Sequence, residues 1–139
     1  MLKLAPSKDG KPLRVLDVGC GIGGSTFYFA SKYGAQVIAL DLSTTSIDLA
    51  KQRLPPSISH LVTFVLGDAL EMSYEPSSFD VVYSRDALLH VPYEKKPELW
   101  KLFHKWLKPS GQLLITDYGC GEVRKDGRTV ETTAYCIAV

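Results

Sequence analysis

Residues 14–24 read Arg-Val-Leu-Asp-Val-Gly-Cys-Gly-Ile-Gly-Gly. The β-branched and apolar run 14–18 ends at glycines, which predicts a short buried strand. The glycine-rich run 19–24 predicts a tight loop, because glycine lets the backbone turn sharply and approach a ligand without a Cβ in the way. From Ser25 the spacing becomes helical, and Gly34 stands where a glycine commonly ends a helix. A strand, a glycine loop and a helix are therefore expected, and the helix is expected to bury the face formed by Phe27, Ala30 and Tyr33.

Four further apolar runs predict buried strands. These runs are 36–41, 62–66, 79–84 and 112–117. Ser43 is predicted to be the N-cap of a helix between the first two of them. A longer helix with Pro97 in its first turn precedes the last strand, and residues 108–111 predict a turn between that helix and the strand. The two helices present apolar stripes at Ile47, Ala50 and Leu54, and at Leu99, Phe103, Trp106 and Leu107.

This alternation of strands and helices implies parallel pairing through right-handed crossovers. We therefore predict an α/β fold with a doubly wound, mostly parallel, Rossmann-like sheet. Residues 1–13 are interpreted as a leader and 14–118 as the core, while 119–139 are undetermined: 119–127 resemble a loop, and 129–139 fit either a strand or a tail.

Composition argues against several function classes. The 139 residues carry a formal net charge of +1, with no electrostatic footprint for a nucleic acid. No apolar run is long enough to span a bilayer, and the N-terminus does not resemble a signal peptide. Cys20, Cys120 and Cys136 lack paired spacing, so we expect reduced thiols, a cytoplasmic location and no metal site.

Acidic residues lie at or just after the ends of three of the predicted strands. In such sheets the ligand lies at the carboxyl ends of the strands, where Asp17, Asp41 and Asp68 are expected to gather. Each of them also has a structural interpretation, as a helix-capping acid, as part of an Asx-turn and as a turn former respectively. All three together favour a ligand site at this edge.

The glycine loop fits two cofactors. Gly19, Gly21 and Gly24 match the GxGxxG pattern of dinucleotide-binding proteins, and Asp41 stands where an acid would hold a ribose hydroxyl, so an NAD-dependent oxidoreductase is one alternative. Asp17 argues against it, because an acid beside the glycines disfavours a pyrophosphate at the helix N-terminus. An acid in this place suits a cationic ligand such as S-adenosylmethionine. Asp41 can accept hydrogen bonds from its ribose hydroxyls, and Asp68 can accept one from its adenine amino group.

The successive motifs resemble those of class I S-adenosylmethionine-dependent methyltransferases. They are Asp17-Val-Gly-Cys-Gly-Ile-Gly-Gly24, Ala39-Leu-Asp-Leu42, Gly67-Asp-Ala69 and Gly111-Gln-Leu-Leu-Ile-Thr-Asp117. More narrowly, Tyr83-Ser-Arg-Asp-Ala-Leu-Leu-His90 and Lys105-Trp-Leu-Lys-Pro-Ser-Gly-Gln-Leu-Leu-Ile-Thr-Asp-Tyr118 resemble the phosphoethanolamine N-methyltransferases.

This resemblance implies a function and a set of roles. The activity would be methylation of phosphoethanolamine toward phosphocholine, with the amine presented unprotonated. His90 is the only histidine placed to act as general base, and in the family the matching histidine is catalytic. Asp86 would face the amine and Tyr118 the phosphate or amine. The remaining S-adenosylmethionine-site residues would be Asp17, Gly19, Gly21, Asp41, Leu42, Asp68, Ala69 and Arg85.

The chain also departs from the family pattern. Only about 13 residues precede the first strand, and the first tyrosine is Tyr28, so the tyrosine that partners the catalytic histidine has no counterpart. The C-terminal strands of the full fold are expected to be missing, which leaves the fifth strand as an open edge inviting self-association unless 129–139 pairs with it. A binding module without activity, or a methyltransferase for another small acceptor, are therefore alternatives.

Overall fold

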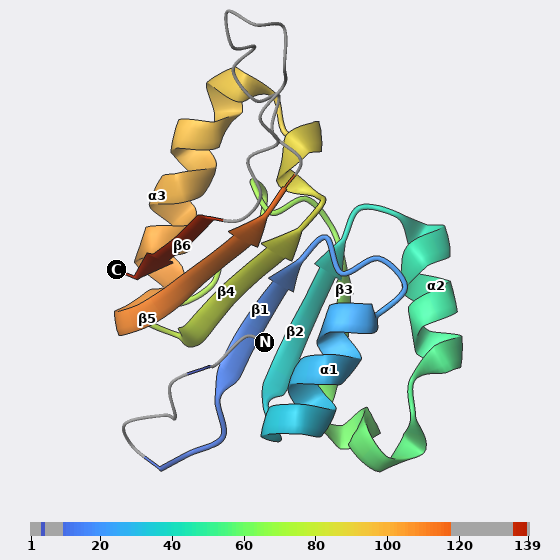
Figure 1. Cartoon of the computed structure of the whole chain (residues 1–139). Coiled ribbons are helices and arrows are strands. Elements are labelled where there is room, and N and C mark those ends of the chain that lie inside the picture. Colours follow the sequence, from blue (N-terminus) through green and yellow to red (C-terminus); the bar gives the residue numbers. More distant parts are fainter. Residues whose placement is uncertain (1–3, 5–9, 118–134, 139) are drawn as a thin grey trace, which may run out of the picture.

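The computed structural model describes residues 4, 10–117 and 135–138. Its strands form one sheet in the order β3-β2-β1-β4-β5-β6, in which β1 to β5 pair in parallel and β6 is antiparallel to β5 (Figure 1). The strands are β1 Arg14–Val18, β2 Gln36–Asp41, β3 Val62–Leu66, β4 Phe79–Arg85, β5 Leu107–Thr116 and β6 Tyr135–Ala138. The doubly wound, mostly parallel fold expected from the sequence is confirmed.

The helices cover both faces of this sheet. Figure 1 shows α1 in front of β2 and α3 behind β5. The α-helices are α1 Gly24–Tyr33, α2 Thr44–Arg53 and α3 Lys96–Trp106, and the short 3₁₀ helices are η1 Pro56–Leu61, η2 Leu88–His90 and η3 Tyr93–Lys95. β1 lies between β2 and β4, so the direction of winding reverses at β1. A doubly wound sheet places its ligand at such a reversal.

Alternation along β1 divides the core in two. Val15 packs with Phe29 of α1, whereas Leu16 packs with Phe103 and Trp106 of α3. Successive side chains of a strand point to opposite faces, so neighbouring residues of β1 belong to different hydrophobic clusters. The central strand is therefore buried on both faces, as its nearly continuous apolar sequence predicts.

Helix α1 is rotated from its expected orientation. Phe29 is buried at 1% exposure and Phe27 is only half-buried, so the expected buried face of Phe27, Ala30 and Tyr33 is partly wrong. A polar contact explains this rotation of α1, because the Thr26 hydroxyl donates a hydrogen bond to Asp17 at 2.6 Å and so turns Thr26 toward the sheet. Phe29 lies three residues further on and shares that face.

The predicted helix ends are confirmed. Gly34 adopts a left-handed conformation with φ 60° at the end of α1, where its N–H donates to Ala30 and Phe29 carbonyls. The Ser43 hydroxyl accepts the Ser46 N–H at the start of α2. Pro97 lies in the first turn of α3, in which Leu99, Phe103 and Trp106 of the predicted stripe are buried, whereas Leu107 begins β5. Local capping chemistry sets the end of α1 and the start of α2, whereas the fixed φ of Pro97 suits the first turn of α3.

The fifth strand begins earlier than the sequence indicates. Phe79 faces Leu107 and Val81 faces Gln112, so residues 108–111 form a bulge within β5 rather than a turn before it. Ser110 has φ 67° in this bulge. A Pro-Ser-Gly run is typical of both features, and only pairing with β4 distinguishes them.

Part of the undetermined tail is a strand. β6 pairs antiparallel with residues 112–115 of β5, so this part of β5 is not an open edge. Of the segment 129–139, residues 135–138 form the strand that pairs with β5. Self-association stays a prediction, now for the outer edge of β6. Within the described residues, no helix is long and apolar enough to cross a membrane.

The orientation of α1 gives a stability prediction. Phe29→Ala should lower the free energy of unfolding by about 3–5 kcal/mol, because it leaves a cavity in the core between α1 and the sheet. Phe27→Ala on the same helix should cost clearly less, because Phe27 is half-buried. Urea denaturation of the two variants measures both effects, and equal losses would contradict the orientation of α1.

Candidate functional site

A cleft of about 460 Å³ opens at the carboxyl ends of the central strands. Its apolar floor is formed by Val18, Leu40, Leu88 and Leu99. Most of the expected site residues line it, namely Gly19, Gly21, Asp41, Leu42, Asp68, Ala69, Arg85, Asp86 and His90. Tyr118 lies outside the described residues. An apolar cleft with a few converging polar groups is typical of a small-molecule site.

The glycine loop packs directly against the loop that follows β4. Gly19 has φ 74°, and a Cβ on it would overlap the Ala87 side chain. The N–H of Gly19 donates to the Leu40 carbonyl at 2.8 Å, which also joins the loop to β2. No other residue type fits at position 19 without displacing a neighbour.

Asp41 holds the glycine loop through its carboxylate. Its Oδ2 accepts the Gly21 N–H at 2.7 Å, and its Oδ1 accepts the Ser43 N–H at 2.9 Å. The Asx-turn interpretation of Asp41 is therefore correct for one oxygen. Each carboxylate oxygen can accept more than one hydrogen bond, so Asp41 can still receive hydroxyl groups from a ligand in the cleft.

Asp68 similarly combines a turn with an available acceptor. Its Oδ1 accepts the Leu70 N–H at 2.9 Å, as the turn-former interpretation predicts. Its Oδ2 accepts no hydrogen bond from the described residues, and Asp68 lines the cleft beside Ala69. One carboxylate oxygen is therefore available to a ligand donor.

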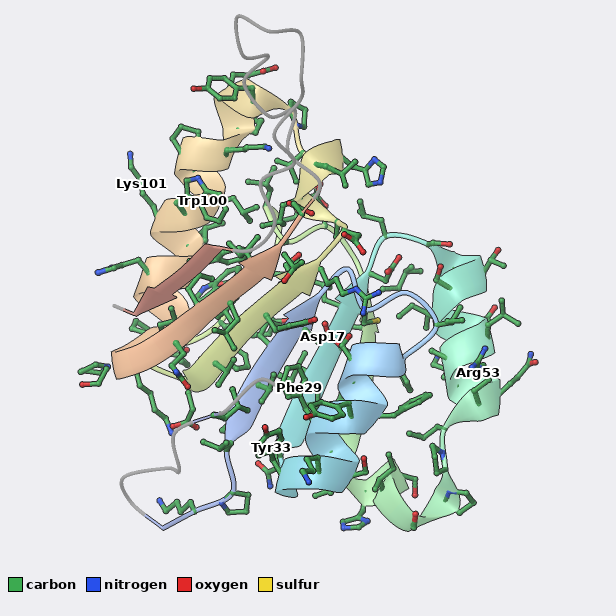
Figure 2. All side chains as sticks on the ribbon, viewed as in Figure 1. Asp17, Phe29, Tyr33, Arg53, Trp100 and Lys101 are labelled. Atoms are coloured by element: carbon green, nitrogen blue, oxygen red, sulfur yellow. The ribbon has the colours of Figure 1, made fainter. Side chains whose placement is uncertain are left out.

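Asp17 does not line the cleft. It is completely buried, and its Oδ2 accepts hydrogen bonds from the Ser25 hydroxyl at 2.7 Å and the Thr26 hydroxyl at 2.6 Å. Figure 2 shows it at the end of β1 beside the start of α1. Because strand side chains alternate, Val18 faces the cleft and Asp17 faces α1. The expectation that Asp17 contacts a cationic ligand directly is therefore corrected, because Asp17 is not among the residues that line the cleft.

The ionisation of Asp17 is costly in this position. Burial raises its pKa from 3.8 to about 6, against the lowering effect of the hydrogen bonds from Thr26 and Ser25, and the charge of Asp41 raises it further. Its Oδ1 is buried and finds no hydrogen-bond partner in the described part of the chain. Two carboxylates near one loop disfavour anions there and favour a cation.

The loop after β4 brings together the residues of the narrower motif. Asp86 adopts a left-handed conformation with φ 54°, and its N–H donates to the Thr116 carbonyl at 2.7 Å. The Arg85 guanidinium pairs with the Asp86 carboxylate at 3.2 Å. His90 ends η2 with an exposed side chain on the wall of the cleft. A carboxylate and an imidazole therefore share the cavity with Asp41 and Asp68.

Cys20 lies inside the glycine loop but is not reactive. Its thiol is free and buried, and burial raises its pKa to about 12, with the charges of Asp17 and Asp41 adding to the effect. It is therefore protonated at neutral pH. Cys120 and the side chain of Cys136 lie outside the described residues. The described residues contain no cluster of side chains that could hold a metal ion.

Sequence reasoning missed the apolar part of the site. Leu88 had no assigned role, and Leu99 was expected to serve only the core of α3, yet both line the cleft. Ala87 was also not singled out. Ala87 contacts Gly19, which is far from it in the chain, and neither hydrophobic periodicity nor motif spacing predicts such a contact.

Residues 15–111 match a family model described as a methyltransferase domain. The chain belongs to this methyltransferase family. In the Haemonchus contortus phosphoethanolamine N-methyltransferase 2, solved with phosphomonomethylethanolamine and S-adenosylhomocysteine, a region 40% identical superposes on 81% of this chain and 26% of that one with a TM-score of 0.75. The fold is thus that of S-adenosylmethionine-dependent methyltransferases.

Curated relatives carry the same name. Phosphoethanolamine N-methyltransferase 1 of Zea mays is 50% identical over 105 residues, which are 76% of this chain and 20% of the relative. The Plasmodium falciparum phosphoethanolamine N-methyltransferase is 41% identical over 105 residues, which are 76% of this chain and 39% of the relative. This methyltransferase domain therefore spans only about a fifth to two fifths of the length of these relatives.

The burial of Asp17 predicts a pH-dependent effect on stability. An acid with a raised folded-state pKa contributes stability that is fully present below its unfolded pKa of 3.8 and is lost as pH rises through about 6. Asp17→Asn does not titrate, so its stability relative to the unsubstituted chain should rise by about 2 kcal/mol between pH 4 and pH 7. Urea denaturation across this range measures the difference.

The control for this prediction is Asp48→Asn on the exposed surface of α2. Its stability relative to the unsubstituted chain should change little over the same range. A difference for Asp17→Asn that does not vary with pH would contradict the raised pKa of Asp17.

Proposed function

We propose that this chain is a methyltransferase domain that binds S-adenosylmethionine and transfers its methyl group to the amine of phosphoethanolamine. One observation carries the proposal. Asp86 and His90 of the narrower motif line the same cleft as Asp41, the last residue of β2, and Asp68, which follows β3. The names of the relatives and of the solved structure support the choice of acceptor.

The cleft residues suit an adenosyl ligand. A volume of about 460 Å³ accommodates a ligand of this size. Asp41 would accept the ribose hydroxyls, and Oδ2 of Asp68 would accept the adenine amino group. Leu42, 70% exposed on the wall of the cleft, offers apolar surface to the adenine ring, with Ala69 nearby. Gly19 and Gly21 leave the backbone open to close approach.

The charge of the site favours S-adenosylmethionine over a dinucleotide. Asp17 and Asp41 carry their charges on either side of the glycine loop and raise the pKa of Cys20 between them. A pyrophosphate bound at the start of α1 would lie close to both carboxylates, which costs electrostatic energy. An ammonium or sulfonium group in that place is stabilised instead.

The bound cofactor would supply an electrophilic methyl group on a sulfonium. Asp86 would pair with the ammonium of the acceptor and orient it, while Arg85 holds the Asp86 carboxylate. His90 would take one proton from that ammonium, which frees the nitrogen lone pair for attack. The imidazole is exposed, so the proton can leave to solvent. Tyr118 remains a proposed substrate residue.

Methyl transfer to the acceptor tests this function directly. The chain is incubated with methyl-labelled S-adenosylmethionine and phosphoethanolamine, with ethanolamine as the acceptor control. Labelled phosphomonomethylethanolamine, with no product from ethanolamine, is the expected result. A folded chain that binds S-adenosylhomocysteine but methylates neither would be a binding module, and transfer to a different small acceptor would refute the proposed substrate.

The role of Asp41 predicts a loss of affinity. Asp41→Asn should weaken S-adenosylhomocysteine binding by roughly 10- to 100-fold, because hydrogen bonds to a charged acceptor are worth about 1.5–3 kcal/mol. Calorimetric titration measures the change, and Asp48→Asn serves as the matched control. Unchanged affinity in a folded Asp41→Asn sample would exclude ribose binding by Asp41.

The role of His90 predicts a loss of turnover alone. His90→Ala should lower kcat by about 100-fold or more, since the general base is removed. Its affinity for S-adenosylhomocysteine should stay within about 2-fold, because the base faces the acceptor rather than the cofactor. His104→Ala, on the exposed surface of α3, is the control. Equal losses of binding and turnover would indicate a structural histidine.

A further inference from the structure

Asp117 lies directly beneath the loop that carries Asp86 and His90. It follows Thr116, the last residue of β5, which pairs with Arg85 at the end of β4. The Thr116 carbonyl accepts the N–H of Asp86 at 2.7 Å. The two strands therefore end side by side. Asp117, directly after β5, lies next to the loop that begins at Asp86, directly after β4.

The Asp117 carboxylate is half-buried at the end of β5, next to the backbone of this loop. Burial raises its pKa most strongly and the charge of Asp86 adds to the rise, while the charge of Lys96 at the start of α3 and the N–H groups of Ala87 and Leu89 lower it. Its Oδ1 is buried and has no hydrogen-bond partner among the described residues. A buried acceptor with spare capacity beside two N–H groups is able to bind them more closely.

The loop needs such an anchor. Asp86 holds a left-handed conformation with φ 54°, which a residue with a Cβ adopts at a cost in energy and only where its surroundings enforce it. Ala87 is pressed against Gly19, so a small shift of the loop would also disturb the glycine loop. His90, at the end of the same segment, depends on this path to reach the cleft.

We propose that Asp117 is a positioning residue, whose carboxylate receives the N–H groups of Ala87 and Leu89 and so holds Asp86 and His90 toward the cleft. It touches neither ligand in this role. Hydrogen bonds of this kind are often long in an unliganded site and shorten when the site closes around its substrate. Only the consequence for turnover rests on the proposed function.

Amide resonances test the contact without any turnover. In the unsubstituted chain, the Ala87 and Leu89 amide protons should shift with pH at one common midpoint above the usual range of aspartate. In Asp117→Asn this shared titration should disappear, and the Asp86 and His90 resonances should move, whereas Asp48→Asn should leave all four as they were. Amides that do not titrate in the unsubstituted chain, or that still do so in Asp117→Asn, would overturn the proposal.

Turnover separates a positioning role from a merely structural one. Where the chain methylates an acceptor, Asp117→Asn should lower kcat by about 10- to 100-fold, as expected for a misplaced reactive group, and leave S-adenosylhomocysteine affinity within about 3-fold. An unchanged kcat would overturn the proposal. If Asp117→Asn does not fold, the proposal stands or falls on whether the Ala87 and Leu89 amides titrate together in the unsubstituted chain. If the chain shows no turnover, it stands or falls on whether the Asp86 and His90 resonances move in Asp117→Asn.

Discussion

The buried carboxylate of Asp17 joins the central strand to the helix that follows it. Two hydroxyl groups of the first turn of α1 donate to one of its oxygens, at 2.7 Å from Ser25 and 2.6 Å from Thr26. These bonds set the rotation of α1, and with it the burial of Phe29 against the sheet. They also stabilise the charged form of Asp17 next to the glycine loop, against the burial that raises its pKa. Asp17 thus adds its charge to those of Asp41, Asp68 and Asp86, although its own side chain does not reach the cleft.

The cleft itself depends on how two loops meet. Gly19, after β1, has no room for a side chain beside Ala87, after β4. The loop that would hold the cofactor and the loop that would hold the acceptor are thus one packed unit. Asp41 completes this unit from β2 by binding Gly21 through its carboxylate. Such packing holds reacting groups in a fixed relation, which is what an in-line displacement requires of a protein that orients two substrates.

The sequence predicts more of the strands than of the contacts between them. Apolar runs bounded by glycine and proline located five strands, because burial on both faces leaves a continuous apolar signal. The same signal could not reveal the bulge at 108–111, where only pairing with β4 distinguishes it from a turn, nor β6, whose strand character depends on β5. The sheet face of Asp17 could have been predicted, because side chains two residues apart in a strand share a face and Asp17 is two residues from Val15. The effect of Thr26 on the rotation of α1 could not have been predicted, because hydrophobic periodicity takes account only of apolar residues.

The site shows the same division. Acids at strand ends were predictable, because topology alone brings the ends of β1, β2 and β3 together. Ala87, Leu88 and Asp117 were not, because their importance comes from packing between distant segments.

The central claim is that this cleft selects a cationic adenosyl ligand and excludes a dinucleotide. Calorimetric titration of the folded chain with S-adenosylmethionine and, separately, with NAD tests it most directly. The account predicts micromolar binding of S-adenosylmethionine and at least about 10-fold weaker binding of NAD, a difference of about 1.4 kcal/mol; equal or tighter binding of NAD would contradict it.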